Sequence, residues 1–292
     1  MTTDHHGAPA RRRYVIIGAG AIGGGIGGLL AAHDIATTLV ARGEHLARMR
    51  RDGLRLRLPE ATHTVPVEAI GGPDEIELTP DDVLVLATKT HQAEAALAAW
   101  ADAPVGEQTA GSALPLLTAL NGVRAESLAL RWFARVFGVC VWMPAVMVTP
   151  GEVIVRAAPR RAVLHTARVP AELTDDRDRA LLQAVAADWA SAGLSVPLPA
   201  DVMAWKYRKL LGNLANAVQA LLGPVEDVED IVAAVRAEAQ EIYAASGVVM
   251  NAEAEEHEHR SAFSVQPVPG APEVMGGSTW QSMTRGSGST EV

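Results

Sequence analysis

Hydrophobic residues in the first two thirds of the chain come in short runs, and this pattern predicts a sheet with buried strands. The runs are bounded by glycine, proline or charged residues, as the strands of an α/β sheet usually are. Helices are predicted to end near Ala32 and Trp100 and to span 175–193. The predicted strands are 14–17, 36–40, 54–58, 82–87, 116–120, one or two strands within 136–148, and 194–198.

The pattern changes after Pro199, where no strand signal recurs. The remaining sequence predicts helices at 201–222, 228–245, 252–263 and from about Ser278 onward. The fold class is therefore α/β, with an N-terminal Rossmann-type doubly wound sheet over 13–198 and an all-helical C-terminal domain over 199–292. Residues 1–12 are small and polar and are expected to form a disordered arm.

The first predicted strand and helix enclose a glycine motif of the kind that binds dinucleotides. Residues 18–23 follow the GxGxxG pattern in the context that it needs, after an apolar strand and at the start of a helix. The first glycine permits a tight turn, the second lets the backbone approach a pyrophosphate, and the third lets the helix pack closely on the strand. The predicted cofactor contacts are Gly18, Ala19, Gly20, Ala21, Ile22 and Gly23.

The end of the second strand favours NADP over NAD. NAD-selective sites usually place an acidic residue there for the ribose hydroxyls. Here Val40 is followed by Ala41-Arg42-Gly43, which offers an arginine and no acid. An arginine suits a 2′-phosphate, so we predict NADP(H) as the cofactor; the alternative is that Arg42 is a solvated loop residue.

Composition narrows the class of partner and the compartment. The 292 residues carry a net charge of −9, so the molecule as a whole repels nucleic acid and anionic membranes. Glycines interrupt the uncharged stretch from Tyr14 to Ala32, which makes it a poor membrane or signal helix. The single cysteine, Cys140, is expected to be a buried small residue in a reducing compartment, the cytoplasm. His257 and His259 lie among glutamates, which favours an exposed acidic helix face, and no metal site is predicted.

Two of the three lysines lie on one predicted helix and point to proton transfer. An ammonium can release a proton, whereas a guanidinium does not. At about 100° per residue, the 201–222 helix carries a narrow polar stripe made of Lys206, Lys209, Asn213 and Asn216. Lysine and asparagine side chains of this kind can hold a carboxylate-bearing ketone and protonate the alkoxide that hydride transfer creates.

These elements together resemble the ketopantoate reductase (2-dehydropantoate 2-reductase) family. The resemblance rests on the glycine motif, on Lys89 and Gln92 after one strand, on Leu120-Asn121-Gly122 after the next, and on Tyr-Arg-Lys-Leu-Leu-Gly-Asn at 207–213. It implies NADPH-dependent reduction of 2-dehydropantoate to (R)-pantoate in pantothenate (coenzyme A precursor) biosynthesis. It also implies a helical C-terminal domain that binds substrate and forms a homodimer.

The resemblance assigns roles by position. Lys209 matches the catalytic lysine of the family, a general acid, and Lys206 is its rival for this role. Asn213 matches a substrate-binding asparagine, and Asn121 matches an asparagine near the nicotinamide and the reacting carbonyl. Further substrate contacts are expected at Asn216, Ser282 and Glu291, and further cofactor contacts at Arg42, Lys89, Asn121, Ala145 and Glu291.

The sequence departs from the family pattern at two places. The second asparagine of the family lies eight residues after the lysine, where this chain has Ala217, and Asn216 lies about 100° away around the helix. Either the helix is locally irregular or the substrate is held differently. Family members also continue beyond the position of Glu291, whereas this sequence ends at Val292, so we expect a helical domain that stops short.

Three hypotheses about function follow. The leading one is an NADPH-dependent 2-dehydropantoate reductase in which Lys209 protonates the developing alkoxide while Asn121, Asn213 and Ser282 orient the substrate. The second is a reductase of a different 2-oxo acid. The third is a non-catalytic NADP-binding member of the family, whose C-terminal domain is incomplete.

Overall fold

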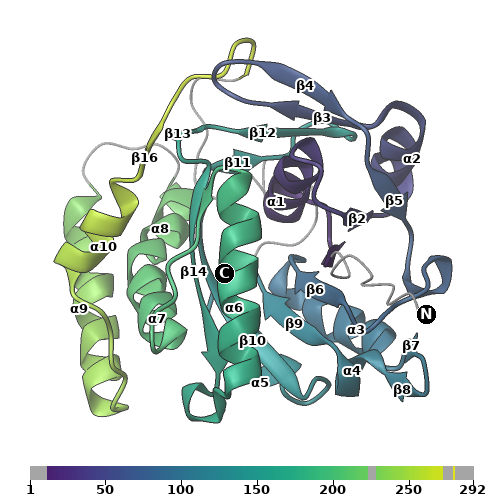
Figure 1. Cartoon of the computed structure of the whole chain (residues 1–292). Helices are drawn as coiled ribbons and strands as arrows, with labels where there is room; N and C mark the ends of the chain where they lie inside the picture. The colour runs from purple at the N-terminus through teal and green to yellow at the C-terminus, as the bar shows by residue number, and fades with distance from the viewer. Residues whose placement is uncertain (1–11, 223–227, 272–278, 280–292) are drawn as a thin grey trace, which may run out of the picture.

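A mixed sheet of eight strands forms the centre of the computed structural model, which describes residues 12–222, 228–271 and 279 (Figure 1). Six neighbouring strands are parallel, and the last two run antiparallel to them through the β10–β14 pairing. Across the sheet the strands are β15 (Leu194–Ser195), β14 (Ala162–Val169), β10 (Arg135–Trp142), β9 (Pro115–Thr118), β6 (Asp82–Leu86), β1 (Arg13–Ile17), β2 (Thr37–Val40) and β5 (Glu68–Ile70).

Helices cover both faces of this sheet, as the doubly wound expectation requires. Side chains alternate along each strand, so Tyr14 and Ile16 of β1 enter one core and Val15 and Ile17 enter the other. The first core includes α1 (Ala21–Ala32) and α6 (Asp176–Ser191). The second includes α3 (Thr90–Ala101), α4 (Ala110–Ala113) and α5 (Ala125–Ala129).

A second sheet lies on the outer side of α1 and was not foreseen as a separate layer (Figure 1). Helix α1 fits between the two sheets because its glycines let side chains of both sheets approach the helix backbone. A Cβ on Gly24 would come within 2.9 Å of Val153 Cγ2 in the second sheet, and a Cβ on Gly27 would collide with Leu39 in β2. The strands are β11 (Ala145–Val146), β12 (Glu152–Val155), β3 (Leu54–Arg57) and β4 (Thr62–Val65).

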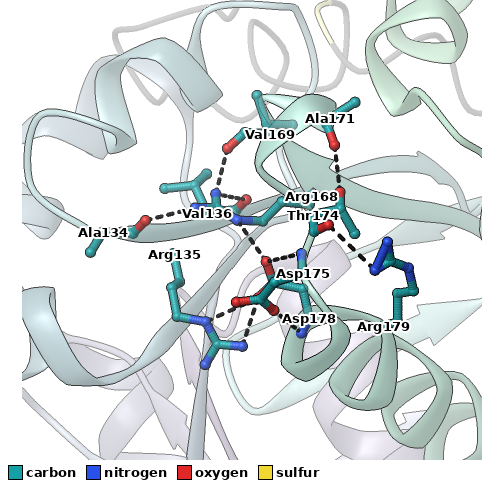
Figure 2. A network of polar contacts seen from close by, with 10 residues as sticks. All are labelled: Ala134, Arg135, Val136, Arg168, Val169, Ala171, Thr174, Asp175, Asp178 and Arg179. Atoms are coloured by element: carbon teal, nitrogen blue, oxygen red, sulfur yellow. Dashed lines mark hydrogen bonds and ion pairs between the residues drawn. The ribbon is translucent and has the colours of Figure 1, made fainter.

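A buried polar network fastens α6 to the β10–β14 pair (Figure 2). The carboxylate of Asp178, 2% exposed, accepts hydrogen bonds from Arg135 at 2.7 Å and from Arg168 at 3.2 Å. Asp178 also belongs to the capping box that begins α6 at Asp175. The Arg168 guanidinium donates further to the carbonyl oxygens of Ala134, Val136 and Val169. Because two guanidiniums compensate this carboxylate, its burial is tolerated.

The region after Pro199 is helical, with two differences from the sequence expectation. The predicted 201–222 helix is broken at Leu214 into α7 (Val202–Asn213) and α8 (Ala215–Leu222). Helices α9 (Glu229–Ala245) and α10 (Glu253–Arg260) follow. The second difference is a strand, β16 (Phe263–Val265), which pairs with β13 (Ala157–Pro159) and corrects the expectation of an all-helical region. The predicted helix from Ser278 lies outside the described residues.

An aromatic stack ties α10 to the main sheet. His165 of β14 stacks on Trp205 of α7 at 3.7 Å between ring centroids, and His259 of α10 stacks on both. His165 Nε2 and His259 Nδ1 are hydrogen-bonded at 2.7 Å. Burial, with a smaller contribution from His259, lowers the pKa of His165 to about 3. His165 is therefore neutral at physiological pH, and α10 is held over β14 and α7.

The remaining elements are short or peripheral. Helix α2 (Gly43–Asp52) follows β2, and a small hairpin, β7 (Pro104–Val105) with β8 (Gln108–Thr109), precedes α4. Cys140 is 1% exposed, as expected, and its burial raises the pKa of the thiol to about 11. Within the described ranges, no helix is both long and apolar enough to cross a membrane.

Candidate functional site

The glycine loop lies where β1 enters α1. Gly18 has a φ of +101°, a conformation that favours glycine, and a Cβ there would come within 2.9 Å of Thr88 Cγ2. A Cβ on Gly23 would collide with the Gly18 carbonyl oxygen, so the third glycine permits the close packing of helix on strand. A Cβ on Gly20, by contrast, would meet nothing within 4 Å. The loop therefore has one open side, at Gly20.

This open side suits the pyrophosphate of a dinucleotide. Gly20 is the N-cap of α1, and the first N–H groups of a helix have no acceptor within the helix. Next to the loop, Thr88 Oγ1 is buried and finds no hydrogen-bond partner among the described residues. A backbone cradle with an orphaned hydroxyl beside it is chemically suited to phosphate oxygens.

Two site residues follow β2: Arg42, which was predicted as a cofactor contact, and His45, which was not predicted. Arg42 is exposed at the N-cap of α2. His45, in the first turn of α2, bridges two loops: its Nε2 lies 2.7 Å from the Ala19 carbonyl oxygen, and the Gly151 N–H donates to its Nδ1 at 2.7 Å. No local motif marks His45, because its partners are 26 and 106 residues away.

The next two strands, β6 and β9, bring Lys89 and Asn121 to the same edge of the sheet. Thr88 follows β6 and contacts the glycine loop at Gly18, and Lys89 comes directly after it as the N-cap of α3. Asn121 follows β9, the parallel neighbour of β6. Ala145 lies in β11 of the second sheet, two residues after Met143, whose carbonyl accepts its N–H.

Lys209 of α7 reaches this edge. Its Nζ donates to Asn121 Oδ1 at 2.6 Å and to the carbonyl oxygen of Val141 in β10. It also lies 5.2 Å from the centroid of the Trp142 ring. The structure therefore brings together two of the predicted site residues, Lys209 and Asn121.

Lys206 points elsewhere. Its ammonium forms a buried ion pair with Glu126 of α5, and the two side chains are 2% and 1% exposed. The Thr118 hydroxyl lies 2.8 Å from the same carboxylate oxygen of Glu126. A lysine enclosed in this way is not available to a substrate at the Asn121 edge, so the geometry favours Lys209 over Lys206 as the proton donor.

A cavity of about 440 Å³ lies between α7, α9 and α10, and Arg208 and Leu211, the neighbours of Lys209 on α7, line it. Asn213 lines it, as does Trp142, whose ring contacts both the Lys209 ammonium and the Arg260 guanidinium, 4.5 Å from its centroid. Other charged residues that line the cavity include Arg208, Arg236 and Glu256. Trp142 and these arginines carried no sequence signal, since only the packing of α7, α9 and α10 assembles them.

The other predicted substrate residues are not all brought together. Asn216 is half-buried in α8, beyond the break at Leu214, and does not line the cavity with Asn213. Ala217 donates its N–H to the Leu214 carbonyl, three residues back, so the helix is locally irregular at this point. Ser282 and Glu291 lie outside the described residues. Among the residues that are described, no group of three or more His, Cys, Asp or Glu is placed to hold a metal.

Comparison with known proteins agrees with this geometry. The family profile described as ketopantoate reductase PanE/ApbA matches residues 14–167. The 2-dehydropantoate 2-reductase of Mesorhizobium japonicum is 31% identical over 230 residues, covering 72% of this chain and 67% of that protein. For curated relatives of the same name from Halobacterium salinarum and Pyrococcus horikoshii, the chain spans only 65% and 64% of their own length.

Solved structures share the fold. A PanE/ApbA family ketopantoate reductase from Ralstonia eutropha JMP134 has a TM-score of 0.73 and 25% identity, covering 94% of this chain and 86% of that chain. A ternary structure of D-mandelate dehydrogenase with NADH and anilino(oxo)acetate has the same TM-score, 0.73, at 19% identity, covering 92% of this chain and 84% of that chain. From the family profile and the Mesorhizobium relative, together with the glycine loop and the Lys209–Asn121 edge, we conclude that the chain belongs to the ketopantoate reductase PanE/ApbA family.

Proposed function

We propose that this chain is an NADPH-dependent reductase that converts 2-dehydropantoate to (R)-pantoate, a step of pantothenate biosynthesis. The observation that carries the proposal is the hydrogen bond from Lys209 Nζ to Asn121 Oδ1, 2.6 Å long, at the carboxyl edge of β9. In an open α/β sheet this edge is where ligands bind. A proton donor held at the same edge of the sheet as the dinucleotide loop is what reduction of a carbonyl group requires.

The residues that would hold the cofactor lie along the carboxyl edge of the main sheet. The open side of the glycine loop at Gly20 would bind the pyrophosphate, Lys89 would contact the same cofactor after β6, and Arg42 would bind the 2′-phosphate. Ala145 and Glu291 complete the proposed contacts. When bound, a reduced nicotinamide supplies hydride to the carbonyl carbon of the substrate.

Side chains of α7 and of the sheet edge would orient and protonate the substrate. The Lys209 ammonium donates a proton to the substrate oxygen as negative charge develops there. Asn121 orients this ammonium and the substrate carbonyl, and Asn213 contacts the substrate from the cavity wall. Asn216, Ser282 and Glu291 are proposed as further substrate contacts from the family resemblance.

The test is a direct assay of the purified chain. We expect NADPH absorbance to fall when 2-dehydropantoate is added, and to fall more slowly with pyruvate or phenylglyoxylate at equal concentration. Separate fluorescence titration with NADPH measures binding independently of turnover. Binding without turnover of any 2-oxo acid would contradict the proposal and favour the non-catalytic hypothesis.

One observation favours a second candidate, reduction of a different 2-oxo acid. Arg208, Arg236 and Arg260 line the cavity beside Trp142 together with Glu253 and Glu256, of which Glu256 is ion-paired with Arg260, and Asn216 lies beyond the break at Leu214. Guanidinium groups suit a substrate with a second anionic group. Faster turnover of 2-oxoglutarate or oxaloacetate than of 2-dehydropantoate in the same assay would support this candidate.

Replacing Arg42 by aspartate tests the proposed choice of cofactor. The substitution removes the cation and introduces the acid that NAD-selective sites use, and aspartate is a good N-cap for α2. We expect the Kd for NADPH to rise by about 10- to 100-fold, as for a lost charge-assisted hydrogen bond, while the Kd for NADH falls or stays level. Arg177→Asp, on the exposed face of α6, is the charge-matched control. Equal weakening toward both cofactors would show that Arg42 does not select the 2′-phosphate.

We extend the proposal to a homodimer formed through the helical region. Large apolar side chains are exposed there, among them Leu221 of α8 at 83%, Ile242 of α9 at 56% and Val249 at 74%. Sedimentation velocity should give the mass of two chains for the parent and of one chain for the Leu221→Asp, Ile242→Asp double variant. A monomeric parent at micromolar concentration would contradict the proposal.

A further inference from the structure

We propose that His45 is a positioning residue that orients the Gly20 amide toward the dinucleotide pyrophosphate, and that its protonation weakens dinucleotide binding. The inference rests on the dinucleotide-binding part of the proposed function. It starts from the two hydrogen bonds of the imidazole, to the Ala19 carbonyl oxygen at 2.7 Å and from the Gly151 N–H at 2.7 Å.

These two contacts determine the tautomer. A carbonyl oxygen only accepts, so Nε2 must carry the proton that it shares with Ala19. A backbone N–H only donates, so Nδ1 must be unprotonated to accept from Gly151. The arrangement is satisfied by neutral His45 alone, because an imidazolium would place its Nδ1–H against the Gly151 N–H.

The contact with Ala19 acts on the cofactor loop through the planar peptide. In a trans peptide the C=O of one residue and the N–H of the next point in opposite directions. Holding the Ala19 carbonyl toward His45 therefore turns the Gly20 N–H away from it. A second hydrogen bond also holds the Ala19 backbone: its N–H donates to the Val40 carbonyl oxygen at 2.8 Å. The open space at Gly20 is where a pyrophosphate can approach this part of the loop.

The contact with Gly151 joins the loop to the second sheet. Gly151 has a φ of +80°, and its carbonyl accepts from the Arg55 N–H at 2.9 Å. A Cβ on Gly151 would come within 2.8 Å of Arg48 Cβ, so this turn packs directly on α2. His45 is thus clamped between two rigid backbone segments, and losing either hydrogen bond releases one of them.

Burial, rather than a neighbouring charge, shifts the pKa of His45. No ionisable residue occurs between Gly18 and Ala32 or in the 149–151 turn. Glu152, which follows this turn, is ion-paired with Arg55 and Arg57. The charged residues near it on its own helix are Arg42, Glu44 and Arg48, of which the last two pair with each other. Burial lowers the pKa of His45, and the hydrogen bond to Ala19 offsets part of this effect.

The sign of the pH effect follows. Above the lowered pKa the imidazole is neutral and both hydrogen bonds exist, so the loop is in its binding geometry. As pH falls through the pKa, the new Nδ1–H faces the Gly151 N–H, and this repulsion displaces the ring from both contacts, so affinity should fall. A cationic His45 that attracted the phosphates directly would produce the opposite slope, with tighter binding at low pH.

Two substitutions separate the two hydrogen bonds. His45→Asn places an amide oxygen near the Nδ1 position but cannot reach Ala19, whereas His45→Gln places an amide N–H near the Nε2 position. We expect His45→Asn to raise the Kd for NADPH by about 3- to 10-fold at pH 8, the range of one hydrogen bond. His45→Gln should stay closer to the parent at pH 8 and lose the fall in affinity that the parent shows below pH 6.5, the ordinary histidine pKa. His63→Gln, exposed on β4, is the matched control and should follow the parent.

The readout is the Kd from NADPH fluorescence, taken as the ratio of parent to variant at each pH. This ratio removes the titration of the cofactor's own phosphate. Parent-like affinity of His45→Asn, or equal pH slopes for the parent and His45→Gln, would overturn the inference. A parent that binds no dinucleotide at any pH would instead overturn the proposed function, and the inference with it.

A measurement on the parent alone covers the case in which a variant does not fold. Binding and protonation are reciprocal, so a cofactor that binds better to neutral His45 must lower the pKa of His45. NMR titration of the His45 ring signals, with and without saturating NADPH, should show the midpoint move to lower pH. An unchanged or raised midpoint would overturn the inference.

Discussion

Replacing Lys209 by methionine is expected to lower kcat by about 10²- to 10⁴-fold while the Kd for NADPH stays close to that of the parent. Methionine keeps most of the apolar stem and removes the ammonium that donates to Asn121 and to the Val141 carbonyl. The loss should appear mainly in kcat because the proton is needed as charge develops on the substrate oxygen. The measurement is initial-rate kinetics of NADPH oxidation beside fluorescence titration of NADPH.

Two further variants show whether charge or proton supply matters. Lys209→Arg keeps a cation at this position but does not give up a proton readily, so it should remain strongly impaired. Arg177→Met removes a positive charge from the exposed face of α6 and should leave kcat unchanged. Turnover of Lys209→Met within about threefold of the parent would be too small a loss for a general acid and would assign the proton to another group.

Replacing Lys206 by methionine is expected to lower the free energy of unfolding by about 3–5 kcal/mol, the usual cost of removing one partner of a buried ion pair. The Glu126 carboxylate is 1% exposed, and its other oxygen, Oε2, has no hydrogen-bond partner in the described structure. Without the lysine, the Thr118 hydroxyl would be the one partner left to this carboxylate among the described residues. Urea unfolding followed by far-UV circular dichroism measures the loss.

The double variant Lys206→Met, Glu126→Gln is the matched control for the ion pair. A neutral amide can still accept from Thr118 and no longer needs a counter-ion, so stability should return most of the way to the parent value. Additive losses in the double variant would show that Lys206 contributes through packing alone. In that case the ion pair would not explain why this lysine is buried.

The pair also bears on the position of the proton donor. Lys206 and Lys209 are three residues apart on α7, so an ion pair to α5 at one limits how the other can rotate over β9 and β10. Lys206 can thus act on Lys209 through the helix that they share. Its role in the site, on this geometry, is structural.

Local sequence signals predicted much of the N-terminal fold. Five uninterrupted strand runs were located within one or two residues, because buried parallel strands read as short apolar stretches bounded by turn residues. Helix α2 and strand β14 were not predicted. β14 carries a histidine, a threonine and an arginine among its eight residues, and it is a strand because it pairs with β10 from Val163 to Val169. Its buried Arg168 depends on Asp178, which lies in another element.

The sequence by itself determined the dinucleotide loop, the edge of the sheet at which Lys89 and Asn121 lie, and the helix that carries the two lysines. These follow from local chemistry: glycine where a Cβ would collide, residues that directly follow a strand, and helical spacing. Only the tertiary structure decided which lysine faces Asn121, that a histidine clamps the loop, and that arginines line the neighbouring cavity. The reason is physical, since these contacts join residues 80, 88 and 106 positions apart and depend on how α2 and α7 pack, which no local pattern encodes.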